Sequence, residues 1–274
     1  DGTDSQKENA AEALGVLADG NDANRIAICA QLVALVRNGT DDQKENAAEA
    51  LGRLADGNDA NQIAIAQEGG ISPLVALVRD GTDDQKENAA WALGCLADGN
   101  DANRIAICAQ LVALVRNGTD DQKENAAEAL SDLAGGNDAN RIAIAQEGGI
   151  SPLVALVRNS QKWHATNALG HLASGNDANR IAIAQEGGIA PLVALARDGT
   201  NWQKSIAAWA LGCLADGNDA NRIAIAQEGG IAPLVALVRD GTDSQKEKAG
   251  EALGRLAGGN DANRIAIAQE GWTP

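Results

Sequence analysis

Aromatic residues are scarce in this sequence, which contains five tryptophans and no phenylalanine, tyrosine or methionine. Its core must therefore be built from aliphatic side chains, mainly those of leucine, isoleucine, valine and alanine. No apolar run reaches the roughly 20 residues of a membrane-spanning helix, so we expect no insertion into a membrane. The aliphatic content is also too high for general disorder, which indicates a soluble, folded protein.

Positive charge is also scarce, because 22 lysines and arginines stand against 38 aspartates and glutamates, a formal net charge of -16. Nucleic-acid binding draws its affinity from basic side chains that neutralise phosphates. The charge therefore argues against a nucleic-acid partner and favours a basic protein or peptide.

Metal-ligating residues are few, with four cysteines (Cys29, Cys95, Cys108 and Cys213) and two histidines. No Cys-x-x-Cys pair is present, and no cysteine has a nearby histidine to complete a zinc set. We expect no metal and no cofactor. Unpaired cysteines at such wide spacing are typical of a reduced, intracellular setting, cytoplasmic or nuclear.

A five-residue string is repeated throughout the chain. Gly-Asn-Asp-Ala-Asn begins at Gly20, Gly57, Gly99, Gly136, Gly175, Gly217 and Gly259. The longest and commonest interval is 42 residues, as between Gly57 and Gly99, within the period expected for stacked helical repeats. We therefore predict a single all-α repeat domain over 1–274, an α-solenoid of about six stacked units with partial units at 1–19 and 259–274.

The unit over 57–98 can be divided into three helices by its helix-start and helix-stop residues. Asn58 is suited to cap a first helix that ends at the Gly-Gly pair after residue 68. Ser72 and Pro73 are suited to start a second helix, through residue 79. Thr82 and Gln85 form a Thr-x-x-Gln capping box that begins a third helix, through about residue 97. Similar boxes begin at Thr3, Thr40, Thr119, Thr200 and Thr242.

The segment NQIAIAQEGGISPLVALVRDGTDDQKENAAWALGCLA resembles an armadillo repeat, the unit of β-catenin and importin-α. The resemblance covers nearly the whole chain and implies a right-handed superhelical scaffold whose third helices line a groove. Two units, over 24–39 and 103–118, lack the Gly-Gly and Ser-Pro signals. Their first and second helices should fuse, which makes these two units similar to HEAT repeats.

A stripe of four positions lies along one face of each third helix, spaced by four, three and four residues. In the armadillo family this stripe resembles the ligand-facing row of the groove, and we call it the third-helix row. It supplies the candidate partner-binding residues Asn88, Trp91 and Cys95; His164, Asn167 and His171; and Trp202, Ile206, Trp209 and Cys213. Weaker candidates are Glu49, Arg53, Glu128, Asp132, Glu251 and Arg255.

In importin-α-like proteins a tryptophan of this row is followed four residues later by an asparagine that binds the peptide backbone. Trp91 and Trp209 match the tryptophan position, but Cys95 and Cys213 follow them. The other units carry Val16, Arg53, Asp132, His171 and Arg255 there. Without an asparagine series, peptide binding of the nuclear-import kind is disfavoured.

Each conspicuous side chain also has a purely structural interpretation. Trp163 and Trp272 lie off the row, so we expect them to cover aliphatic surface of a neighbouring helix. Trp202, Ile206 and Trp209 together would form a contiguous apolar patch, which favours a contact surface. His164 and His171 are seven residues apart, roughly 10.5 Å along a helix, too far for two direct ligands of one ion.

No Gly-rich phosphate loop, zinc-protease motif or paired catalytic carboxylates are present in the sequence, so we expect no enzymatic activity. The leading hypothesis is a protein–protein interaction scaffold that binds a protein or peptide partner through the third helices. The alternative is an architectural spacer, natural or designed, that contacts its neighbours through its ends or outer face. The chain starts at a third helix and ends after a first helix without polar capping repeats, which suggests part of a larger assembly.

Overall fold

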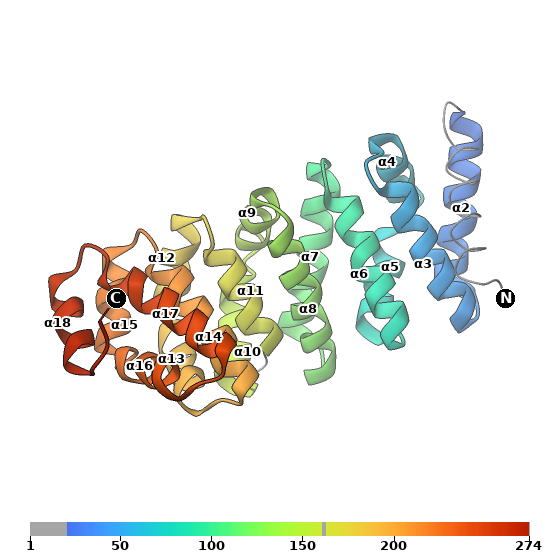
Figure 1. The fold of residues 1–274 in the computed structure, drawn as a ribbon. Helices are drawn as coiled ribbons and strands as arrows, with labels where there is room; N and C mark the ends of the chain where they lie inside the picture. Colours follow the sequence, from blue (N-terminus) through green and yellow to red (C-terminus); the bar gives the residue numbers. More distant parts are fainter. Residues whose placement is uncertain (1–20, 161–162, 274) are drawn as a thin grey trace. The chain divides into compact units, whose positions relative to one another are not determined.

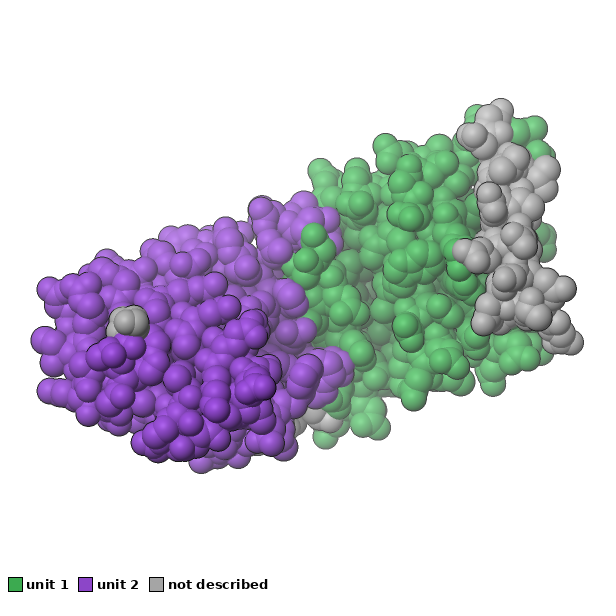
Figure 2. All heavy atoms as spheres, viewed as in Figure 1, with its two compact units in different colours: residues 1–136 green, residues 137–274 purple. Residues whose placement is uncertain are grey.

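The computed structural model describes residues 21–160 and 163–273, and these residues form helices joined by short connections, without a strand (Figure 1). The chain divides into two compact units, residues 1–136 and 137–274 (Figure 2). The partial repeat expected over 1–19, including the capping box at Thr3, lies outside the described residues. The single repeat domain expected over 1–274 stays a prediction.

Unit 1 contains seven described helices. They are α2 (Asp22–Asn38), α3 (Asp41–Ala55), α4 (Asp59–Gln67), α5 (Ile71–Asp80), α6 (Asp83–Ala97), α7 (Asp101–Asn117) and α8 (Asp120–Gly136). In the complete repeat, α4, α5 and α6 are the first, second and third helices. α2 and α7 are single helices of 17 residues where other repeats have two. The predicted fusion of first and second helices is confirmed in both places.

Unit 2 contains ten described helices in which the three-helix order recurs. They are α9 (Asp138–Gln146), α10 (Ile150–Ser160), α11 (Trp163–Ala173), α12 (Asp177–Gln185), α13 (Ile189–Asp198), α14 (Asn201–Ala215), α15 (Asp219–Gln227), α16 (Ile231–Asp240), α17 (Asp243–Ala257) and α18 (Asp261–Gln269). The first helices are α9, α12, α15 and α18, the second helices α10, α13 and α16, and the third helices α11, α14 and α17.

Local capping explains where most helices begin. Thr40, Thr82, Thr200 and Thr242 each accept from the backbone N–H three residues on, and the glutamine there accepts from the threonine N–H. Thr119 makes the same two bonds with Gln122. The second helix differs from its prediction. In α5, Gly70 is the N-cap and the helix begins at Ile71, so Ser72 and Pro73 lie inside the first turn.

The Gly-Gly pair sets the tight connection between first and second helices. Gly69 has a φ of 73°, a left-handed conformation that glycine adopts at low cost. A Cβ on Gly70 would lie 2.6 Å from Ile65 Cγ2, closer than side chains approach. Both glycines are therefore required where the backbone turns between α4 and α5.

The core of each unit consists of leucine, isoleucine, valine and alanine side chains that lie between consecutive repeats. Leu51, Leu74 and Leu93 are fully buried in unit 1, and Leu153 and Leu192 in unit 2. A repeat buries these side chains only by stacking on the next repeat.

Buried asparagines near the start of four helices join consecutive repeats. The Nδ2 group of Asn221 in α15 donates to the Leu214 carbonyl of α14 at 3.0 Å and to the Arg180 carbonyl of α12 at 3.2 Å. The same pair of bonds recurs at Asn103, Asn179 and Asn263. These side chains satisfy carbonyls at the end of the third helix and hold successive first helices in register.

Candidate functional site

Third helices pack against each other within each unit, so their rows lie side by side. In unit 1, α6 packs against α3 and α8, and in unit 2, α14 packs between α11 and α17 (Figure 1). Because the helices share one sequence register, equivalent positions of the row fall on neighbouring helices. The row of α6 has Trp91 exposed, with Asn88 and Cys95 half-buried.

Trp91 lies on a glycine of the preceding third helix. A Cβ on Gly52 of α3 would lie 2.4 Å from the Trp91 ring, so the indole contacts the bare backbone of α3. Even so, 42% of the residue stays exposed. Gly94 of α6, the equivalent glycine facing α8, has no atom within 4 Å of its Cβ position. The Trp91 indole of α6 therefore covers the backbone of α3, whereas the surface of α6 at Gly94 is not covered by a side chain.

Trp209 of α14 is seated in the same way on the preceding third helix of unit 2. A Cβ on Gly170 of α11 would lie 2.2 Å from its ring, and the ring meets His171 edge-on at 4.9 Å between centroids. Ile206, which was expected to share an exposed apolar patch with it, is only 8% exposed, and Cys213 is only 4% exposed. The exposed apolar patch predicted for α14 is therefore wrong for Ile206, which is buried between helices.

The other end of the α14 row is exposed. Trp202 is 60% exposed, and its ring meets that of Trp163 edge-on at 6.1 Å. Trp163, which the sequence places off the row, thus packs beside a row residue. His164 is buried and Asn167 half-buried. The buried His164 does not contribute surface to the row.

The α8 row is a concentrated acidic surface. Burial together with the nearby charges of Asp132 and Glu124 raises the pKa of Glu128. Burial also raises the pKa of Asp132. On α6, burial and the charges of Asp56 and Asp98 raise the pKa of Cys95 to about 11. Each of these shifts reflects an environment that disfavours more negative charge.

The remaining candidates lie on α3 and α17, and each of these helices supplies one glutamate and one arginine. Arg53 Nη2 lies 2.9 Å from Glu49 Oε1 on α3. On α17, Glu251 is exposed, while Arg255 is half-buried with its Nη1 3.9 Å from the Cys213 sulfur. These guanidinium groups leave the α3 and α17 rows less acidic than the α8 row.

His171 is half-buried, and its pKa is lowered by burial and by the charge of Arg141. Among the described residues, no three histidine, cysteine or acidic side chains gather as metal ligands would. Nor does any helix in the described ranges have the length and apolar character to cross a membrane.

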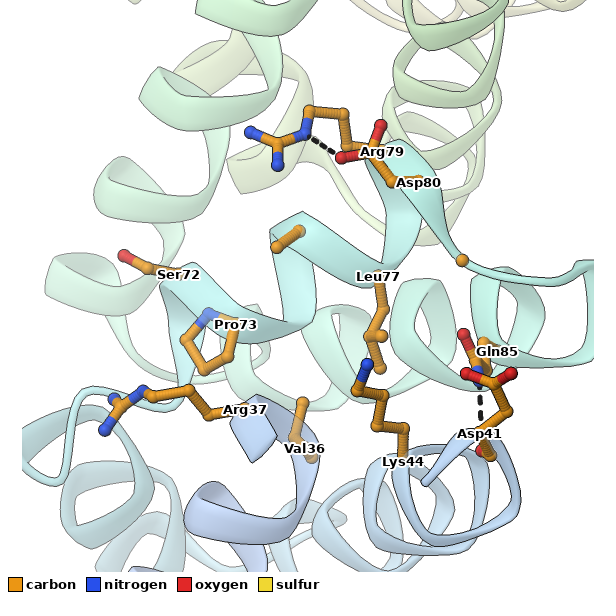
Figure 3. Close-up of a pocket in the computed structure, with 12 residues that line it drawn as sticks. Val36, Arg37, Asp41, Lys44, Ser72, Pro73, Leu77, Arg79, Asp80 and Gln85 are labelled. Carbon is orange, nitrogen blue, oxygen red and sulfur yellow. Dashed lines mark hydrogen bonds and ion pairs between the residues drawn. The ribbon is translucent and has the colours of Figure 1, made fainter. Parts of the chain in front are cut away.

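Unit 1 also contains a pocket of about 440 Å³ beside the second helix α5 (Figure 3). Its polar groups pair with each other: Gln85 donates to the Asp41 carbonyl at 3.0 Å, and Asp80 accepts from Arg79 at 2.5 Å. Burial opposes ionisation of Asp80, but bonds from Arg79 and Gln122 outweigh it, so its pKa is lowered. Figure 3 shows the guanidinium groups of Arg37 and Arg79 apart from each other. The charged side chains of this pocket therefore do not converge on one point where a ligand could bind them together.

Comparisons with known proteins agree with this architecture. A family model described as a HEAT-like repeat matches residues 41–96 and 201–256. An engineered protein of known structure is 30% identical, with a TM-score of 0.66 over 85% of this chain and 97% of its own. A second engineered protein is 33% identical, with a TM-score of 0.69 over 98% of this chain and 69% of its own. No curated protein sequence is significantly similar.

A designed armadillo repeat protein in complex with peptide (KR)4 is 24% identical, with a TM-score of 0.65 over 83% of this chain and 98% of its own. The chain contains HEAT-like repeats and has the fold of the armadillo repeat proteins. The α-solenoid fold expected from the sequence is thereby confirmed. Within this armadillo-like fold, the rows of α6 and α8 combine an exposed indole with exposed carboxylates.

Proposed function

We propose that this armadillo-like chain is a non-enzymatic scaffold whose third helices bind a basic protein or peptide, with α6 and α8 of unit 1 as the main contact. The observation that carries the proposal is the pair of exposed carboxylates on the α8 row, Glu128 and Asp132, which lie one helical turn apart on the same face. A cation placed there would relieve the repulsion between these groups, so binding a lysine or arginine would be favourable.

Trp91 supplies the second part of such a contact. Its indole is fixed by packing on Gly52 but keeps an exposed face. Aromatic faces attract guanidinium and ammonium groups and also pack against their aliphatic stems. Because Trp91 is equivalent to Glu128 on the adjacent helix, one basic side chain could contact an indole while the next meets a carboxylate.

The fold neighbour bound to the peptide (KR)4 supports the choice of probe. A peptide of alternating lysine and arginine, labelled with fluorescein, would be titrated with the chain and followed by anisotropy. We expect binding that weakens as salt rises, because exposed charges are screened. Trp91→Ala should weaken binding about 10-fold, as loss of a central aromatic anchor does. Glu128→Gln combined with Asp132→Asn should weaken it at least as much.

Leu35→Ala is the matched control, because Leu35 is an exposed apolar residue of unit 1, on α2 rather than a third helix. It should leave the peptide affinity unchanged. The assignment to α6 and α8 would be contradicted if the wild type, the Trp91→Ala variant and the carboxylate variant bound the peptide with equal affinity. The circular dichroism spectra must be unchanged, so that all three proteins are known to be folded.

A further inference from the structure

The first helices carry an exposed isoleucine at the same position in every repeat. In unit 2 these are Ile142, Ile181, Ile223 and Ile265, between 42% and 60% exposed. Unit 1 has the same feature at Ile26, Ile63 and Ile105. Single exposed apolar residues are ordinary, but a row of them at one position is a surface. We call these residues the isoleucine row of each unit.

The row is held rigidly within unit 2. Asn179, Asn221 and Asn263 donate to the carbonyl immediately before Ile142, Ile181 and Ile223, respectively. Each isoleucine is thus fixed relative to the next by a buried hydrogen bond. A surface whose geometry is already set loses little conformational freedom when it binds a partner.

Alanines and polar residues surround the isoleucine on the exposed face of each first helix of unit 2. At 100° per residue, positions four and three before Ile223 and three and four after it fall on its side of the helix. These are Asp219, Ala220, Ala226 and Gln227, of which Ala226 is half-buried and the other three are exposed. Five such positions on each of four helices approach the roughly 20–30 residues that each partner contributes to a standard interface.

The exposed aspartate of this face is paired with an arginine that is less exposed than the aspartate. Each first helix of unit 2 pairs one aspartate with one arginine three residues later, as Asp219 does with Arg222. The carboxylates of this face are therefore already paired with cations, which weakens their attraction for a basic partner. The face would also add little to the repulsion between two molecules that each carry a net charge of -16.

The repeated sequence of the first helices indicates which molecule binds the isoleucine row. α9, α12, α15 and α18 have the identical sequence DANRIAIAQ. A surface built from a series of identical helices is complementary in order and composition to a second copy of the same series, and this chain carries such a series itself. We propose that the isoleucine rows are a self-association surface on which a second copy of this chain packs, isoleucine row against isoleucine row.

Sedimentation velocity of the full chain over roughly 1 to 200 µM tests this. The sedimentation coefficient of the wild type should rise with concentration. It should rise further at high salt, because apolar contacts persist while repulsion between acidic molecules is screened. Replacing Ile142, Ile181, Ile223 and Ile265 with glutamine should weaken association at least about 10-fold, and replacing all seven isoleucines should abolish it.

Trp202→Gln is the control, because Trp202 is as exposed as Ile265 but lies on a third helix. It should associate as the wild type does. A wild type that stays monomeric over the whole range would overturn the proposal, whether or not the variants fold. So would association that disappears with salt, or a folded glutamine variant that associates as strongly as the wild type.

Discussion

At the scale of single residues, the tryptophans of the row act first as packing groups. Trp91 and Trp209 each occupy the space above a glycine of the preceding third helix, Gly52 and Gly170. Trp202 does not pack on a glycine among the described residues, and it is the most exposed of the three. The surface that each indole offers to a partner is therefore set by the helix beneath it.

This packing can be tested with Gly52→Ala in unit 1. The added methyl group would meet the Trp91 ring at 2.4 Å, so we expect a loss of about 1–3 kcal/mol in unfolding free energy. Gly94→Ala is the control, because its Cβ position has no atom within 4 Å. Alanine there should be neutral or stabilise the helix by up to about 1 kcal/mol. Urea unfolding measures both, and equal effects of the two substitutions would contradict the packing of Trp91 on Gly52.

At the scale of helices, the sequence was sufficient for most of the fold. Capping boxes, paired glycines and the recurring Gly-Asn-Asp-Ala-Asn string are local signals, and the helices begin and end close to them. The fused helices α2 and α7 follow from the missing Gly-Gly signal. The N-cap of α5 was mispredicted because Gly70 ends the preceding turn and starts the next helix without a side-chain cap.

The contact between helices of successive repeats gives a second stability prediction. Asn221→Ala would leave the carbonyls of Leu214 and Arg180 without their buried donor, so we expect a loss of about 2–4 kcal/mol in unfolding free energy. Asn159→Ala, at an exposed position near the end of α10, should change it by less than about 0.5 kcal/mol. Unfolding curves that coincide for the two variants would show that this asparagine does not join the repeats.

At the scale of the whole molecule, the candidate site was only partly predictable. The third-helix row was found from spacing, but which members are exposed depends on residues about 40 positions away in the chain, such as Gly170 beneath Trp209. That information lies in the stacking of repeats and in no local pattern. The isoleucine rows were missed, although one isoleucine recurring at one position of every first helix was a visible signal.

Hydrogen–deuterium exchange of the full chain, with and without the alternating lysine–arginine peptide, tests the central claim most directly. We expect the peptide to slow amide exchange in α6 and α8, where Trp91, Glu128 and Asp132 lie. Exchange in the first helices α9, α12, α15 and α18, which carry the isoleucine row of unit 2, should not change. Protection confined to those first helices, or no protection at saturating peptide, would contradict the assignment of the third helices as the binding face.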